Sequence, residues 1–572
     1  MINIDSLTIK AFIEENKNFF IGAKVQKIQQ PTRRDLIFSL RNFSYSKKFY
    51  INIHPNFFHI CFISKENEKK RNIQIPKVAP MFCMLLRKYL ENSKIININQ
   101  PSNERIIELH FQSNDEYQGV TDLCLAIELM GKHSNIILYN LNSKIILGCI
   151  HNVSEEKSKE RELAGLLPYV YPKPKLKNNL LTTDFQEFKS LLITNISGTS
   201  KIISDNFYYI SHDLSKKVLN FFKFQSNNDT DKLNEIYSYL KKCILLENLS
   251  PTIAQDLSDY SIFNFCSEQK SSVNDVIDSY YAQEQFRFLF SNMYNKIKNT
   301  FDKDLKKLNL QINNLNNQLL TEDKSYLYKK YADLLMANQY YLKDNVKNII
   351  ILQDFNSSDN IKIPVDPSLS IVQNANIYYK KYNKNKTSID FAKKRLKFLM
   401  EQSSFIEEQL FYLNLASSFE DLDDIFNKDT ISSDNNYNGK NISKNKVNNR
   451  NVKKDKTDKK EIPILKIDEY IAYIGKNSRQ NDYILSKLSS PYDIWFHIKD
   501  APSAHLLLKT FKNTLISEDV IFKAAKAVKE ISVGVLSSKV SVIYTLRKYV
   551  NKSTQKGLAF VTYSNEKEIV ID

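Results

Sequence analysis

Residues 494–498 carry side chains whose chemistry suits contact with unstacked nucleic-acid bases. They include Trp495, the single tryptophan of the chain, and His497, and Lys499 follows directly. Phe496 alternates with Trp495 and His497, which predicts a half-buried strand with one face on a core and one face in solvent. Aromatic rings beside cationic donors suit single-stranded or looped RNA. The alternative is a tryptophan that fills a small core, and the strand by itself favours that alternative.

The sequence shows no catalytic motif. It contains no Walker loop and no GxGxxG, HExxH or GxSxG motif, and its ten glycines leave little room for phosphate-binding glycine loops. His54 and His59 flank Pro55 in an aromatic segment, which is typical of structural roles. The six cysteines are widely spaced without a CxxC pair, which argues against a zinc site and a disulfide framework. We therefore expect a binding protein without metal or cofactor, not an enzyme.

Positive charge dominates the composition. The 81 lysines and arginines outnumber the 64 aspartates and glutamates, which gives a net charge of +17. Such an excess favours a polyanionic partner, with nucleic acid first and an anionic membrane surface second. The N-terminus lacks the basic and apolar segments of a signal peptide, and no apolar run approaches the ~20 residues that span a bilayer. We expect a cytoplasmic protein that is not inserted in a membrane.

The hydrophobic pattern predicts a multidomain α+β chain with an α/β domain at each end. The N-terminal domain covers residues 1–175 and ends at a Pro-containing linker, and the C-terminal domain covers residues 463–572. The elements expected in the N-terminal domain are helices over 6–20 and 79–90 and strands over 25–29, 36–40, 49–53, 105–111, 123–130 and 135–139.

Three different segments lie between these domains. Residues 176–272 predict short helices, and the turn at Gly198 is compatible with a helix-hairpin-helix module or with an ordinary helical connector. Residues 273–426 predict a long antiparallel coiled-coil hairpin, interrupted at about 349–372 by a small β insertion. Residues 427–462 are rich in Asn, Lys, Asp and Ser and predict a disordered basic linker.

Several blocks of the sequence resemble the NFACT family, and more closely its bacterial branch, long labelled fibronectin-binding protein A-like. The blocks are Asp5 with residues 27–31, residues 79–88, residues 104–107, the run Glu-Leu-Met-Gly-Lys-His-Ser-Asn-Ile-Ile at 128–137, residues 475–483, the Trp495 segment and residues 544–550. They follow the family order across nearly the whole chain. The resemblance makes RNA binding the preferred interpretation of the Trp495 strand.

The resemblance implies a role in ribosome quality control. Family members bind the split large (50S) ribosomal subunit, with its 23S rRNA and proteins, while stalled peptidyl-tRNA and its nascent chain are still attached. They recruit tRNA, with alanine tRNA expected in the bacterial branch, and support tailing of the nascent chain without mRNA. The ribosomal peptidyl-transferase centre would form the bonds. The implied protein is a monomeric factor that positions tRNA.

The resemblance also implies two sets of RNA-contacting residues. The set expected to bind tRNA is Asp5, Arg87, Lys88, Glu104, Arg105, Glu128, Lys132, His133 and Asn135. The set expected to bind RNA in the C-terminal domain is Lys476, Arg479, Asn481, Trp495, His497, Lys499, His505 and Tyr544. Glu104 stands where the family usually has Asp, and residues 502–505 are Pro-Ser-Ala-His where Pro-Gly-Ser-His is common. We expect Glu104 and Arg105 at an exposed turn.

Three other functions are compatible with parts of the sequence. A generic tRNA- or rRNA-binding assembly or rescue factor needs the same basic surfaces. A formamidopyrimidine-type DNA glycosylase shares the N-terminal resemblance, but position 2 is Ile2 instead of the proline that such enzymes use. A fibronectin-binding surface adhesin requires export, for which the sequence carries no signal.

Overall fold

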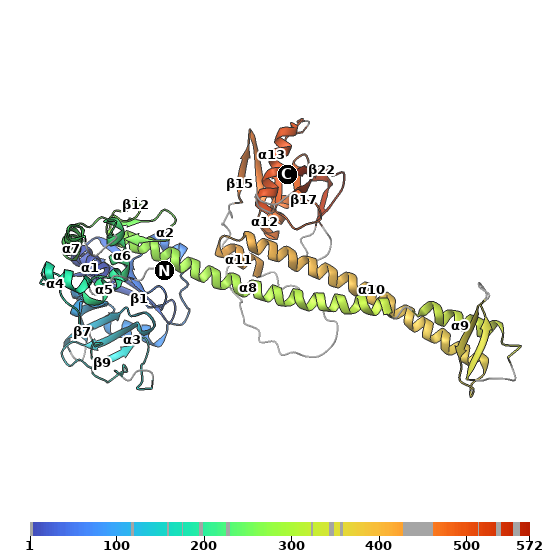
Figure 1. The fold of residues 1–572 in the computed structure, drawn as a ribbon, viewed down its shortest axis with the longest axis horizontal. Helices are drawn as coiled ribbons and strands as arrows, with labels where there is room; N and C mark the ends of the chain where they lie inside the picture. Colours follow the sequence, from blue (N-terminus) through green and yellow to red (C-terminus); the bar gives the residue numbers. More distant parts are fainter. Residues whose placement is uncertain are drawn as a thin grey trace. The chain divides into compact units, whose positions relative to one another are not determined.

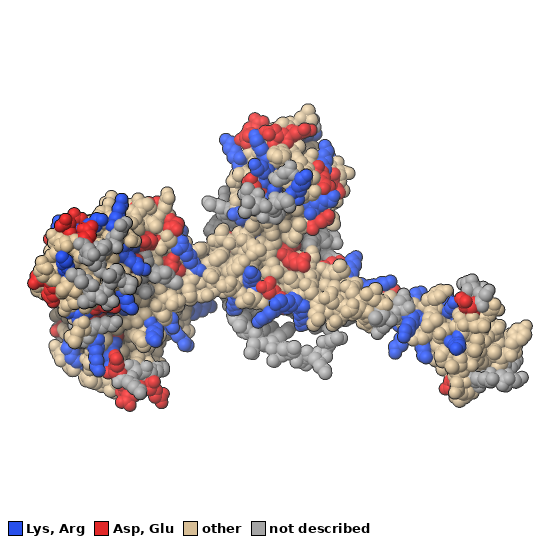
Figure 2. Space-filling model, in the orientation of Figure 1, with Lys and Arg blue, Asp and Glu red and all other residues tan. Residues whose placement is uncertain are grey.

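The computed structural model describes residues 4–115, 119–156, 160–173, 176–193, 198–224, 229–321, 324–342, 348–354, 359–426, 462–512, 514–532, 539–552 and 561–571. The chain divides into two compact units, residues 1–289 and 290–572. Lys and Arg side chains are spread over both units and interspersed with Asp and Glu (Figure 2). No helix in the described part of the chain is long and apolar enough to cross a membrane.

A nine-stranded antiparallel sheet forms the frame of the first unit (Figure 1). It consists of two meanders, β1 to β4 and β5 to β9, which meet where β1 pairs with β5. The strands are β1 (Lys24–Gln29), β2 (Asp35–Asn42), β3 (Tyr45–Asn52), β4 (His59–Phe62), β5 (Lys94–Asn99), β6 (Ile106–Asp115), β7 (Gly119–Glu128), β8 (Asn135–Asn140) and β9 (Ile146–Cys149). Because alternate residues point to opposite faces, the sheet supports a different apolar cluster on each side.

One face of the sheet carries the main core of the unit. The helices α1 (Ser6–Phe20) and α3 (Met81–Leu90) pack their apolar residues there, and Asp5 caps α1 by accepting a hydrogen bond from the Thr8 N–H at 2.8 Å. The same core continues through the helices α4 (Phe185–Ile193), α5 (Thr199–Asn206), α6 (His212–Phe221) and α7 (Thr230–Ile244). The sheet and the helical segment therefore share one apolar core.

The other face of the sheet holds a smaller cluster. Cys124 and Ala126 of β7 pack there with Tyr139 of β8, under a segment that includes Leu163 and Tyr169. Both faces of the central strands are consequently shielded from solvent.

A buried ion pair fixes the first turns of the long helix α8 (Val273–Thr321) to the sheet. The Arg71 guanidinium, which is fully buried, contacts the Asp278 carboxylate at 2.6 Å. Glu15 of α1 accepts the Val273 N–H at 2.7 Å, which satisfies a free donor at the start of α8. Truncating one partner of such a pair costs about 3–5 kcal/mol, so this contact anchors the first turns of α8 within the first unit.

The second unit contains an antiparallel helix pair formed by α8, from residue 290 onward, and α10 (Ile371–Leu415) (Figure 1). Tyr294 donates to the Asn414 side chain at 2.7 Å, and Ser403 contacts the Asn309 side chain at 3.3 Å. The helices α9 (Ser325–Ala337) and α11 (Phe419–Phe426) pack on α10. A two-stranded hairpin, β13 (Ile349–Gln353) and β14 (Asn360–Pro364), occupies the predicted insertion.

The C-terminal domain is a six-stranded antiparallel sheet with a covering on each face. Its order is β15-β16-β18-β17-β19-β22. The strands are β15 (Ile464–Ile467), β16 (Tyr470–Gly475), β17 (Ile494–Ile498), β18 (His505–Leu508), β19 (Val540–Leu546) and β22 (Lys567–Ile571). The helix α13 (Glu518–Ser532) packs on one face, and the π-helical turn Ile484–Leu488 after α12 (Ser478–Tyr483) packs on the other.

The structure confirms the predicted fold class, with sheet domains at both ends and long paired helices between them. Three short strands, β10 (Thr252–Ile253), β11 (Tyr260–Ser261) and β12 (Glu268–Gln269), were not predicted within the helical segment. Residues 194–197 lie outside the described residues, so the helix-hairpin-helix assignment stays a prediction. The predicted linker also lies outside them, apart from residue 462.

Candidate nucleic-acid interface

Glu104 and Arg105 lie directly before β6, an interior strand, at the end of the N-terminal sheet where this strand begins. They follow the short helix η1 (Pro101–Asn103), whose last residue has a φ of 56° and turns the chain toward the strand. The Gln100 side chain donates to the Glu104 carbonyl at 2.7 Å and to the Ser6 carbonyl at 2.9 Å. These bonds tie the loop to the start of α1. Both side chains are half-buried, which corrects the expectation of an exposed turn.

The Arg105 guanidinium is positioned without being neutralised by an ion pair. It lies over the Phe58 ring, 5.4 Å from the ring centroid, and makes no hydrogen bond or ion pair within the described residues. Burial lowers the pKa of Arg105, and the nearby carboxylates of Asp5 and Glu104 act in the opposite direction. Because arginine stays charged through such shifts, its N–H donors remain available to a ligand.

Lys132 and His133 are brought to the same end of the sheet by strand pairing. Antiparallel pairing places the end of β7 beside the start of β6, and the backbone just after β7 donates an N–H to the Arg105 carbonyl at 2.9 Å. The chain then turns through η2 (Gly131–His133), where Gly131 has a φ of 63° and lies against the Phe58 ring. The Lys132 and His133 side chains are both exposed. Two sequence motifs thus meet around one phenylalanine.

A cavity of about 280 Å³ opens beside Glu104 and Arg105. Residues 5–6 and 103–105 of the sheet domain line it, together with Lys177, the end of α5 at residues 204–205 and residues 208–212 up to the start of α6. The lining side chains with the most useful chemistry are Asp5, Glu104, Arg105, Lys177, Tyr208 and His212. The helix α6 begins at the cavity, where Ser211 caps it by accepting the Leu214 N–H at 3.1 Å. The positive end of a helix dipole therefore faces the same space as Arg105.

This arrangement suits a phosphodiester with a neighbouring base. Arg105 offers paired N–H donors that match phosphate oxygens. Asp5 and Glu104 offer carboxylates that accept from exocyclic amines of bases, and Tyr208 offers an aromatic ring.

The remaining cations of the predicted tRNA set lie on α3. The Arg87 Nε donates to the Ile28 carbonyl at 2.9 Å and lies 3.7 Å from the Glu91 carboxylate, so part of this guanidinium is already engaged. Lys88 is exposed, and its Nζ lies 5.2 Å from the centre of the Tyr89 ring. Lys88 is therefore the more available cation of the two.

Glu128 and Asn135 are buried and correct the expectation that they bind tRNA directly. Glu128 is fully buried, forms a two-pronged ion pair with Arg161 and accepts from the Tyr169 hydroxyl at 2.9 Å. Asn135 donates to the His151 carbonyl at 2.8 Å. With their polar atoms held by protein groups, both residues support the strands that carry the exposed Lys132 and His133.

The C-terminal set divides in the same way. Trp495 is fully buried, and His505 and Asn481 are each 3% exposed. The strand β17 packs Phe496 into the cluster under α13 and Trp495 into the cluster under the π-helical turn, so neither face is open. This corrects the prediction of a half-buried strand with a solvent-facing indole. In this structure Trp495, His505 and Asn481 cannot stack on or donate to RNA.

Four other residues of this set keep some exposure. Lys499 is exposed and pairs with the Glu568 carboxylate at 2.6 Å, whereas Lys476, His497 and Tyr544 are half-buried. Tyr544 stacks on Phe496 with ring centroids 5.6 Å apart. The Arg479 side chain lies outside the described residues. Of the described members, Lys476 and Lys499 offer the most accessible charge.

Acid is expected to destabilise the C-terminal domain. Burial lowers the pKa of His497 from 6.5 to about 4, despite the opposing hydrogen bond to the Ile498 carbonyl. Below pH 6.5 the unfolded chain therefore binds more protons than the folded one, and about 2 kcal/mol of stability is lost by pH 5. Fluorescence of the single tryptophan during urea unfolding at pH 7 and pH 5 measures this loss. It should shrink in His497→Gln, and equal urea midpoints at the two pH values would contradict it.

Sequence reasoning missed the contribution of the helical segment to the cavity. Lys177, Tyr208 and His212 lie far along the chain from Glu104 and carry no motif, and their proximity arises from the shared core. The adjacent tyrosines 208 and 209 are the one local signal, and alone they are indistinguishable from helix-packing residues. Tyr209 anchors the junction by hydrogen bonding to Asn103.

Comparisons with known proteins cover both ends of the chain. A family model described as NFACT N-terminal and middle domains matches residues 5–437, and one described as NFACT protein RNA binding domain matches residues 459–562. A Bacillus subtilis protein named Rqc2 homolog RqcH is 24% identical, covering 100% of this chain and 98% of that protein. Its Streptococcus pneumoniae counterpart of the same name is 25% identical, covering 99% and 97%.

Solved structures are similar to about half of the chain. A fibrinogen binding protein from Staphylococcus aureus is 23% identical and has a TM-score of 0.41, covering 48% of this chain and 98% of that chain. The N-terminal part of a fibronectin/fibrinogen-binding protein from Streptococcus suis is 24% identical and has a TM-score of 0.40, covering 49% and 99%.

Proposed function

The chain belongs to the NFACT family, and from that membership we propose that it acts in ribosome quality control. It binds the large ribosomal subunit that carries stalled peptidyl-tRNA after the ribosome has split. It recruits a further tRNA, with alanine tRNA expected, and supports tailing of the nascent chain without mRNA. The tail then marks that chain for degradation. The protein works in the cytoplasm as a monomer.

The observation that carries the proposal is the Arg105 guanidinium, which lines a cavity between the sheet and the helical segment and makes no ion pair within the described residues. A charged group kept free of protein partners is suited to an anionic ligand. The similarity to proteins named Rqc2 homolog RqcH extends over the whole length, which supports assigning this cavity to tRNA instead of to an unrelated anion.

The protein would act by positioning. Arg105 and the start of α6 would hold a tRNA phosphate, while Asp5 and Glu104 would accept from base amines beside it. Peptide bond formation would take place in the peptidyl-transferase centre of the ribosome. Holding two reactants in register can itself supply several kcal/mol of the barrier reduction.

Sequencing of RNA that copurifies with the tagged full-length chain from its own cells tests the proposal. We expect large-subunit rRNA without its small-subunit counterpart, together with strong enrichment of one tRNA, alanine tRNA being the expected species. Recovery of both subunits, or of large-subunit rRNA without tRNA selectivity, would replace the proposal with a general assembly or rescue factor. Absence of rRNA would refute a ribosomal role.

A further inference from the structure

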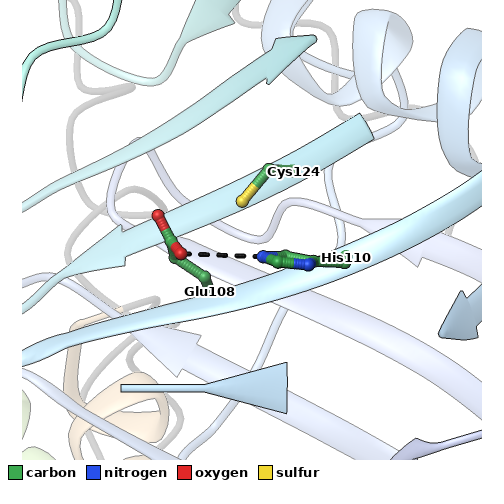
Figure 3. Close-up of side chains that lie close together, drawn as sticks. All are labelled: Glu108, His110 and Cys124. Carbon is green, nitrogen blue, oxygen red and sulfur yellow. Dashed lines mark ion pairs between the residues drawn. The ribbon is translucent and has the colours of Figure 1, made fainter. Parts of the chain in front are cut away.

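Three side chains with metal-binding chemistry converge on one face of the N-terminal sheet. Glu108 and His110 lie on β6, and Cys124 lies directly opposite His110 on β7. Because residues two apart on a strand share a face, Glu108 points to the same side as His110. Figure 3 shows the carboxylate, the imidazole and the thiol gathered between these two strands. In the described part of the chain, this is the one place where three such groups meet.

The distances among these groups suit a shared cation better than a direct bond. The ligand atoms of the three residues all lie within 4.8 Å of one another. The His110 Nε2 lies 3.6 Å from the Glu108 Oε2, which is too long for a good hydrogen bond. Two ligands on a tetrahedral zinc ion, with bonds of about 2.0–2.2 Å, lie about 3.3–3.6 Å apart.

Two buried atoms at this place lack the partners that burial normally requires. The His110 Nε2 has no hydrogen-bond partner, and neither has the side-chain oxygen of Asn99. Asn99 pairs with Glu108 across β5 and β6, so it belongs to the same row of side chains. Buried polar atoms without partners are uncommon in folded proteins. Such atoms mark places where an ion or a water molecule can bind.

The carboxylate also has the supporting bonds typical of a metal ligand. The Tyr139 hydroxyl donates to the Glu108 Oε1 at 2.8 Å, and the Tyr171 hydroxyl donates to the same oxygen. The Glu108 Oε2 faces His110 and accepts a long hydrogen bond from the Asn99 side-chain nitrogen at 3.4 Å. Hydrogen bonds that orient a ligand through its second atom are a regular feature of metal sites.

We propose that Glu108, His110 and Cys124 form a binding site for a borderline-soft divalent cation of the zinc class. A thiolate, an imidazole and a carboxylate are the ligands that such cations select. Binding displaces the Cys124 thiol proton to solvent, while the carboxylate and the neutral imidazole bind through lone pairs.

The site would act as a clamp within the sheet. β6 begins one residue after Arg105, and β7 ends three residues before Gly131. A cation that cross-links these two strands would therefore hold the loop before β6 and the loop after β7 in place. The clamp is structural and is independent of the proposed function. Sequence reasoning excluded zinc because His110 and Cys124 form no local motif, whereas strand pairing places them side by side.

Cobalt substitution tests the site directly on the full-length protein without a histidine tag. After chelator treatment, titration with Co²⁺ should produce a thiolate-to-cobalt charge-transfer band that saturates at one equivalent and disappears when Zn²⁺ is added. The band should be lost in Cys124→Ser and retained in Cys243→Ser. Cys243 is an equally buried cysteine outside the cluster, so it controls for the loss of a buried thiol.

A measurement on the wild-type protein is also needed, because a variant that fails to fold would lose the cobalt band for an unrelated reason. X-ray absorption at the zinc edge of the zinc-loaded wild-type chain should show one sulfur ligand with nitrogen and oxygen ligands completing the shell. A band that persists in Cys124→Ser, a zinc shell without sulfur, or no binding of Co²⁺ by the wild-type chain would each overturn the proposal.

Discussion

Replacing Glu104 and Arg105 together with alanine is expected to abolish tail synthesis while leaving the fold intact. The Arg105 guanidinium makes no ion pair within the described residues, so its removal forfeits little more than its contact with the Phe58 ring. A cation–π contact of this kind is worth about 0.5–2 kcal/mol. The effect on stability should therefore be small.

The effect on tRNA should be large by comparison. Each charge-assisted hydrogen bond to phosphate contributes about 1.5–3 kcal/mol, and a bidentate arginine makes two. Losing both corresponds to a reduction in affinity of at least about 100-fold, at about 1.4 kcal/mol for each factor of ten. Mass spectrometry of a stalled reporter chain measures the tails, and circular dichroism during heating measures the fold.

Two further variants distinguish an effect of the cavity from an effect of positive charge elsewhere on the domain. Arg33→Ala removes an exposed arginine of the same domain and should leave tails in place, because Arg33 does not line the cavity. Glu104→Asp retains the carboxylate and matches the residue common in the family, so tails should persist. If stalled chains still receive tails with the double alanine variant, the cavity is not the tRNA site.

Local patterns predicted the regular elements well where amphipathic periodicity was strong. The helix expected over 6–20 is observed with the same bounds, and the strand expected over 135–139 is extended by one residue. β4, β5 and β9 were not predicted. All four residues of β4 are buried, so it shows no alternation of apolar and polar residues. Strands of two residues, such as β10, leave no periodic signal at all.

The residues of the sheet part of the site came from the family resemblance, and neither their meeting nor the cavity was predicted. Strand register brings the two motifs together, because β6 begins opposite the end of β7. Tyr208 reaches the same place through packing of the helical segment on the sheet, and no local pattern encodes that contact. The same limit applies to Cys124 and His110, which become neighbours only through strand register.

The C-terminal domain shows why alternation alone cannot decide exposure. Alternation tells which residues share a face, and it separated Phe496 from Trp495 correctly. It does not tell whether a second layer covers the other face. Here the π-helical turn Ile484–Leu488 supplies that layer, so a pattern typical of a half-buried strand belongs to one that is buried on both sides.

Trp495→Ala is therefore expected to unfold the C-terminal domain, and loss of RNA binding should follow from that. The indole is fully buried and stacks on His497 with ring centroids 5.4 Å apart. Truncating such a side chain costs about 3–5 kcal/mol, a large share of the stability of a domain of this size. Hydrogen exchange of the full-length chain should show lost protection across β17, β18 and β19 in this variant.

Trp495→Phe distinguishes a packing role from RNA contact. The indole N–H has no hydrogen-bond partner within the described residues, so phenylalanine removes no bond and loses only part of the apolar contacts. This change should cost about 1–2 kcal/mol, less than the alanine variant, and should leave cosedimentation with large ribosomal subunits unchanged. Lys499→Ala, which removes an exposed charge, should weaken cosedimentation without loss of protection. If Trp495→Phe weakens binding while the domain stays protected, the indole must reach RNA, and the π-helical turn must then open on the ribosome.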